Sequence, residues 1–278
     1  MTSPVTLDLI ELDGKATPDA LADEIFRQNP AVPFPVPLEE FSRLAGIESI
    51  SELDSDGFAG MLVTNAEKSR GAIFVRAGTD PRRRRFTIGH ELGHFLLPWH
   101  KQERFECKPA DVTISSSALG QSSKLPGIEI EANTFASELL MPRREFKRTM
   151  NAYGEPELEH VADLSSKFDV SVEATIWRYK SLSDRPVAFV FAHNNVVRYW
   201  TKGPEFPYSL CVRKGQSLPR ESAASAGELL WDCVPSHLWL EEKRQLVLPE
   251  TILEQTLHQV GGYSVTLLYI DELPDTDE

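Results

Sequence analysis

The sequence is poor in cysteine, in long apolar runs and in positive charge, and each shortage excludes a class of protein. Only three cysteines occur, Cys107, Cys211 and Cys233, so neither a disulfide framework nor a cysteine-rich zinc site is expected. No run approaches the ~18 apolar residues that a membrane span needs, and residues 1–14 lack the apolar core of a signal peptide. We therefore expect a cytoplasmic protein without a membrane segment.

The charge balance argues against nucleic acid as the main partner. The formal net charge is −13 and the isoelectric point is near 5.1, whereas proteins that grip phosphate backbones are usually basic. Direct DNA binding is therefore not expected. The content of 41% hydrophobic and 26% charged residues is ordinary for a globular chain, and 278 residues are enough for two domains.

One helical stretch carries the clearest chemistry, His90-Glu91-Leu92-Gly93-His94. Two histidines four residues apart project from the same face of a helix and can hold one metal ion between them. The carboxylate of Glu91 points partly around the helix, so it can reach a water on the metal without being a ligand. This is the H-E-x-x-H pattern of hydrolytic zinc enzymes, with Glu91 as the base. Catalytic zinc also needs a third protein ligand and an open fourth position.

A second amphipathic helix, between Pro126 and Pro142, is expected to supply the third ligand. Glu129 and Asn133 lie four residues apart on one flank of its apolar face. Glu129 could therefore reach the metal while Asn133 steadies a ligand through a hydrogen bond. Glu131 lies on the opposite flank and is not excluded by helical phase, but it has no polar companion four residues later. Glu129 is the preferred ligand.

The segment between these two helices, Trp99 to Gly127, is predicted to be a long loop that could act as a flap. Cys107 lies within it. One interpretation is a thiolate that reaches back to block the metal, and the preferred one is an ordinary free cysteine. His100, just beyond the first helix, is expected at the surface.

The chain before the motif predicts several short elements. Residues 4–12 alternate weakly and suggest a strand, and helices are expected over 18–28, capped by Thr17, and over 38–45. The runs 58–65 and 71–76 predict a hairpin. Its edge could bind an extended peptide as an added strand, although a purely structural sheet is preferred. The motif helix should begin after Asp80, and its arginines Arg82–Arg85 should form local acid pairs on a solvated face.

The chain after the second helix predicts a helix over 142–151 and a helix pair over 158–168 and 171–182. The pair looks like a helix-turn-helix, but its acidic residues outnumber its basic ones, so it is expected to pack or to dock a partner. β-prone runs follow, with tight turns at Asn194-Asn195 and Gly261-Gly262. These runs are 187–192, 196–200, 208–213, 229–234, 252–260 and 263–270.

Two segments resemble the ImmA/IrrE metallopeptidases, namely Arg83–His94 and Glu129–Pro142. The hairpin before them is also similar, as is Phe168-Asp169-Val170-Ser171 followed by Ala174 and Arg178, so the resemblance covers roughly residues 35–185. It implies a gluzincin-like fold in which His90, His94 and Glu129 bind the metal and Glu91 is the catalytic base. Gly89 stands where the family usually has alanine. The resemblance further implies a helix-turn-helix transcriptional repressor as the substrate, and a C-terminal unit related to GAF-type sensors.

Together these observations predict an α+β fold with three parts. A zincin-like metallopeptidase core is expected over residues 1–155, a helix-turn-helix-like pair over 156–185 and a β-rich α+β regulatory domain over 186–278. The expected function is that of an intracellular zinc endopeptidase that cleaves a repressor and so induces stress or mobile-element genes. The same ligands could also hold Mn or Fe(II). Two alternatives stay open, a repressor-binding regulator with a mainly structural metal and a DNA-binding regulator that uses the helix pair.

Overall fold

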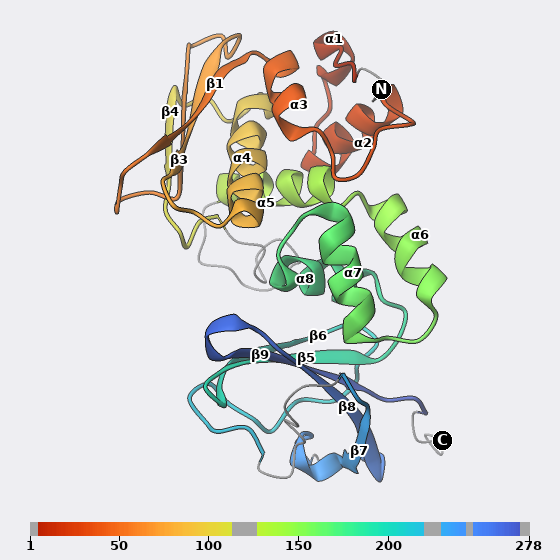
Figure 1. Ribbon diagram of the computed structural model, residues 1–278. Helices are drawn as coiled ribbons and strands as arrows, with labels where there is room; N and C mark the ends of the chain where they lie inside the picture. The colour runs from red at the N-terminus through yellow and green to blue at the C-terminus, as the bar shows by residue number, and fades with distance from the viewer. Residues whose placement is uncertain (1–4, 113–126, 220–228, 243–246, 273–278) are drawn as a thin grey trace. The chain divides into compact units, whose positions relative to one another are not determined.

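The computed structural model describes residues 5–112, 127–219, 229–242 and 247–272. Over these residues the protein has an α+β fold with eight α-helices and two β-sheets (Figure 1). The chain divides into two compact units. The first comprises Met1–Phe146 and Leu164–Trp177, and the second comprises Lys147–Asp163 and Arg178–Glu278. The division into three parts at residues 155 and 185 stays a prediction.

Three short helices open the first unit, α1 (Leu9–Leu12), α2 (Pro18–Gln28) and α3 (Leu38–Ala45). The helices expected over 18–28 and 38–45 are confirmed, and Thr17 caps α2 by accepting a hydrogen bond from the amide of Ala20 at 3.2 Å. The strand expected over 4–12 is wrong. The side chain of Asp8 accepts the amide of Ile10 at 2.9 Å and so begins a helical turn, a local hydrogen bond that outweighs a weak alternation of apolar residues.

The sheet of the first unit contains β1 (Ile47–Leu53), β2 (Gly60–Thr64), β3 (Gly71–Arg76) and β4 (Arg104–Cys107) in the order β1-β3-β2-β4. The expected hairpin is confirmed as the antiparallel pair β2 and β3. β1 runs parallel to β3, and β4 runs antiparallel to β2. Neither β1 nor β4 was expected, and β4 lies inside the segment predicted as a loop. Residues 113–126 of that segment lie outside the described residues.

The motif helix α4 (Pro81–Leu96) is sandwiched between this sheet and α5 (Gly127–Leu140) (Figure 1). Its side chains are therefore buried continuously from Phe86 to Phe95. Asp80 caps the helix as expected, because its carboxylate accepts the amides of Arg82 and Arg83. The predicted acid pairs are also present, and they are Arg82–Asp169, Arg85–Asp169, Arg84–Glu39 and Arg84–Glu52, at 3.2 to 3.6 Å.

Three further helices follow, α6 (Arg143–Tyr153), α7 (Leu158–Phe168) and α8 (Val172–Leu182). The predicted helix pair is therefore confirmed as α7 and α8. Asp169 between them has a φ of 51°, the left-handed conformation that closes a tight turn between two helices and that aspartate tolerates better than most residues.

The second unit contains an antiparallel sheet of five strands in the order β6-β5-β9-β8-β7. Their bounds are Val187–His193 for β5, Val196–Lys202 for β6, Asp232–Pro235 for β7, Thr251–His258 for β8 and Tyr263–Tyr269 for β9. Asn194 and Asn195 both have positive φ, 49° and 60°, as the predicted tight turn requires. The strand expected over 208–213 is wrong, because Tyr208 and Val212 are buried in the core beside Trp239 and only Leu210 makes an isolated bridge.

No helix within the described part of the chain has both the length and the apolar character to cross a bilayer.

Candidate metal centre

The two histidines of the motif meet as the helical spacing requires. His90 and His94 are fully buried, and their Nε2 atoms lie 3.1 Å apart. Each Nδ1 atom is engaged elsewhere, that of His90 with Asn133 and that of His94 with His100, both at 2.9 Å. The lone pairs on the two Nε2 atoms are therefore free to face a common point, as two ligands of one metal ion must.

Of the two glutamates on α5 that could be the third ligand, Glu129 reaches these histidines. Its Oε2 atom lies 3.1 Å from Nε2 of His90 and 3.4 Å from Nε2 of His94. Glu131 turns to the other flank, where its Oε2 atom accepts hydrogen bonds from Nε1 of Trp99 at 2.6 Å and Nε2 of His100 at 2.9 Å. The structure thus brings His90, His94 and Glu129 together, as the sequence predicted, and leaves Glu131 outside the group.

Asn133 lies where the sequence placed it, one turn after Glu129. Its Oδ1 atom bonds Nδ1 of His90, and its Nδ2 atom donates to the carbonyl of Asp111 at 2.6 Å. The amide is therefore fixed with its oxygen toward the ring. Because that oxygen can only accept, Nδ1 of His90 carries the proton and Nε2 is left to bind a metal.

His100 was expected at the surface, and this is wrong. It is 1% exposed and links His94 to Glu131 through its two ring nitrogens. If Nε2 of His94 binds a metal, its Nδ1 donates to His100, and Nε2 of His100 donates to Glu131. Lys68 holds this turn in place, because its Nζ donates to the carbonyls of His94, Leu97 and His100, where a cation complements the end of α4.

Nothing in the sequence marked this chain of hydrogen bonds. It depends on how sharply the chain turns after α4, and a single histidine six residues beyond the motif gives no periodic signal.

The carboxylate of Glu91 is buried beside the ligands. Both of its oxygens lack a hydrogen-bond partner among the described residues, which is costly unless a ligand or water completes the site. Burial raises the pKa of Glu91 to about 7, against the opposing charge of His90. Strand β2 approaches so closely here that a Cβ atom on Gly60 would collide with Oε1 of Glu91 and with the side chain of Thr87. A carboxyl group with a pKa near neutrality is suited to exchanging protons.

The charges of the three ligands also fit a cation. Burial lowers the pKa of His94 to about 4, so its ring is neutral. Burial acts to raise the pKa of Glu129, but hydrogen bonds with His90 and His94 hold it well below the usual range. Burial opposes a proton on His90, while the bond to Glu129 and the charge of Glu91 favour it, and the net effect raises the pKa of His90. The cluster therefore attracts positive charge at the point where a metal ion would lie.

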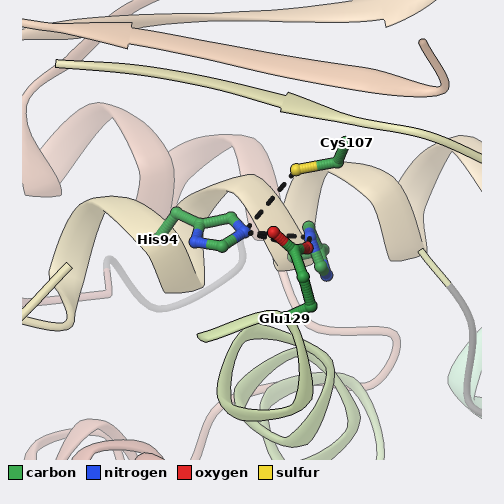
Figure 2. A group of neighbouring side chains, drawn as sticks. His94, Cys107 and Glu129 are labelled. Atoms are coloured by element: carbon green, nitrogen blue, oxygen red, sulfur yellow. Dashed lines mark hydrogen bonds and ion pairs between the residues drawn. The ribbon is translucent and has the colours of Figure 1, made fainter. Parts of the chain in front are cut away.

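A fourth potential ligand comes from β4. The Sγ atom of Cys107 lies 3.5 Å from Nε2 of His94, and together with one atom each of His90, His94 and Glu129 it forms a group within 4.8 Å. Figure 2 shows Cys107 entering from the strand and Glu129 from the helix on the opposite side. The preferred interpretation of Cys107 as an ordinary free cysteine did not anticipate this position, because β4 itself was not expected.

The donor set and its spacing fit zinc. Bond lengths of about 2.1 Å to nitrogen or oxygen and 2.3 Å to sulfur give tetrahedral edges of about 3.4 Å and, from sulfur, about 3.6 Å. The separations between ligand atoms are 3.1, 3.1 and 3.4 Å among the nitrogen and oxygen atoms, and 3.5 Å from Sγ to His94. Small movements would therefore suffice to bind an ion.

Comparisons with known proteins agree with this geometry. The family model described as the IrrE N-terminal-like domain, of the M78 peptidases, matches residues 48–180. No curated protein matches the chain significantly. Among solved structures, the chain is similar to a Mycobacterium tuberculosis transcriptional regulator at 17% identity, over 91% of this chain and 87% of that one, with a TM-score of 0.54. That likeness shows the fold alone. The prediction of an α+β fold with a zincin-like core is confirmed.

Proposed function

Since residues 48–180 belong to the ImmA/IrrE family of metallopeptidases, we propose that the cluster on α4 and α5 hydrolyses peptide bonds with a bound metal ion. The observation that carries the proposal is the convergence of Nε2 of His90, Nε2 of His94 and Oε2 of Glu129 within 3.4 Å of one another. Two imidazoles and one carboxylate are a ligand set of catalytic zinc, and Mn or Fe(II) could also occupy it.

The residues of the site then have separate roles in the reaction. When bound, zinc supplies a Lewis acid that makes water more acidic and polarises the scissile carbonyl. Glu91 takes a proton from the attacking water on a carboxylate oxygen and passes it to the leaving amine. Burial raises the pKa of Glu91 and so favours the return of the proton, whereas the charge of a bound cation would favour the ionised form that accepts it. Asn133 and His100 orient the two histidine rings through their Nδ1 atoms.

We further propose a protein substrate, a transcriptional repressor with a helix-turn-helix domain, whose cleavage in the cytoplasm induces stress or mobile-element genes. This follows from the family resemblance, and the net charge of −13 would favour a basic, DNA-binding partner. The solved relative is named a transcriptional regulator, which fits a place in gene control. The sheet of the second unit would then serve regulation.

The test is co-incubation of the zinc-loaded chain with the repressor encoded beside its gene, followed by analysis for a discrete product. Glu91→Gln is the matched variant, since it keeps the side-chain volume and all three ligands and removes the base. Its rate should fall by about 10²- to 10⁴-fold with the zinc content unchanged. Undiminished cleavage by Glu91→Gln would refute the mechanism.

A second candidate function is favoured by Cys107. Four protein ligands are typical of structural zinc, so a protein that binds the repressor without cutting it would retain zinc and form a stable complex with no product. The third possibility, DNA binding through α7 and α8, would appear as salt-sensitive binding to duplex DNA.

A further inference from the structure

Strand β4 pairs with the edge of β2 that lies away from β3. Cys107 lies directly opposite Gly60 in the antiparallel register, and the amide of Ala59 donates to the carbonyl of Cys107 at 2.8 Å. Gly60 is also the residue on which a Cβ atom would collide with the carboxylate of Glu91. An extended peptide that took the place of β4 on β2 would therefore pass the catalytic base.

Side chains alternate between the two faces of β4, and two of them point toward the candidate metal centre. Phe105 and Cys107 share one face of the strand and are 3% and 1% exposed, whereas Arg104 and Glu106 are exposed. The ring of Phe105 stacks on His94 with centroids 4.3 Å apart, and Sγ of Cys107 lies 3.5 Å from Nε2 of the same histidine. The strand thus fixes the thiol among the ligand atoms from the side opposite Glu129 (Figure 2).

A second observation points to the same place. Both carboxylate oxygens of Glu91 are buried, and no described residue makes a hydrogen bond of ordinary geometry to them. The thiol of Cys107 interacts with this carboxylate, so the thiol lies between the catalytic base and the three candidate ligands. Four ligand atoms from three separate elements, α4, α5 and β4, converge there.

We propose that Cys107 is a fourth protein ligand that closes the metal centre and keeps the peptidase latent. This rests on the metal site of the proposed function. With an ion bound, the thiol would have lost its proton to solvent, and the thiolate would fill the coordination position that a reacting water needs. β4 is only four residues long, and among the described strands it pairs with β2 alone. A substrate peptide that replaces it on β2 would withdraw Cys107 and open that position.

Cobalt replacement tests the ligand directly in the full-length wild-type chain. Thiolate bound to Co(II) gives a charge-transfer absorption band in the near ultraviolet, beside the visible bands that any tetrahedral Co(II) site shows. We expect this band in the wild type and in Cys211→Ser, whose thiol is exposed, and its loss in Cys107→Ser and Cys107→Ala. Chelator competition should show zinc binding more than about tenfold weaker in both Cys107 variants, at least the effect of losing an outer hydrogen-bond partner.

The results of these experiments distinguish the proposed role of Cys107 from the proposed peptidase activity. Visible bands without the charge-transfer band in the wild type, or equal zinc affinity in Cys107→Ser, would overturn the role of Cys107 and leave the peptidase site intact. Failure of the wild type to bind Co(II) or zinc at all would overturn both. Latency itself predicts that Cys107→Ala cleaves faster than the wild type, and a slower rate with metal fully bound would contradict it.

Discussion

Two glycines on α4 give opposite expectations for the same substitution. A Cβ atom on Gly89 would lie 3.4 Å from Cβ of Ala136 and 3.8 Å from Cδ1 of Leu140, which is ordinary contact. A Cβ atom on Gly93 would lie 3.1 Å from Cδ1 of Phe135, and 3.2 and 3.3 Å from Cα and the carbonyl oxygen of Ala132. Space is therefore available at Gly89, whereas at Gly93 the backbone of α5 itself must move.

These contacts set the sign of the change in stability. Replacing glycine by alanine in a helix interior gains about 1 kcal/mol, and burying a methyl group at Gly89 adds up to about 0.8 kcal/mol. Gly89→Ala should therefore raise the free energy of unfolding by about 1–2 kcal/mol. At Gly93 the overpacking cost of about 1–3 kcal/mol offsets or exceeds the gain, so Gly93→Ala should lower stability by up to about 2 kcal/mol.

The assay is thermal unfolding of the metal-free protein, because bound metal would add its own contribution to the apparent stability. With about 2–4 °C per kcal/mol for domains of this size, Tm should rise by about 2–8 °C in Gly89→Ala and fall by up to about 8 °C in Gly93→Ala. Gly93→Ala should also weaken zinc binding, since it displaces the helix that carries Glu129. A fall in Tm for Gly89→Ala, or equal shifts for both variants, would refute the packing described for α4 and α5.

Other residues of the first unit give expectations of the same kind. Gly60→Ala should displace the carboxylate of Glu91 and lower the cleavage rate by about 10²-fold or more. Zinc analysis should find the metal retained, and loss of the metal would contradict this explanation. Glu129→Gln should abolish tight zinc binding, whereas Glu131→Gln should weaken it by only about 10–100-fold through the histidine relay. Equal losses would contradict the choice of ligand. Hydrogen bonds from Arg27 lower the pKa of Glu24, which is buried, from 4.5 to about 2. The ionised carboxylate therefore contributes its full stabilisation above pH 4.5. The Tm deficit of Glu24→Gln should shrink as the pH falls toward 2, and a constant deficit would exclude this cause.

Features that depend on neighbours a few residues apart could be predicted from the amino-acid sequence. The spacing of His90 and His94, the flank shared by Glu129 and Asn133, and the cap at Asp80 are all consequences of helical geometry. The tight turn at Asn194-Asn195 is likewise local. For these, the periodicity of the chain is enough, because the interactions that stabilise them lie within one or two turns.

Features that depend on segments far apart in the chain could not be predicted from local patterns. β4 exists because the edge of β2 offers hydrogen-bond partners to residues 104–107, and four residues within a polar segment are too few to show a strand pattern. The positions of Cys107 and His100 follow from that pairing and from the turn after α4. The same limit explains the error at 208–213, where the core of the second unit, not a neighbouring strand, buries the apolar side chains. The sequence could therefore predict that His90, His94 and Glu129 lie together, but the position of the Cys107 thiol beside them depends on a strand pairing between residues more than 40 positions apart (Gly60 with Cys107).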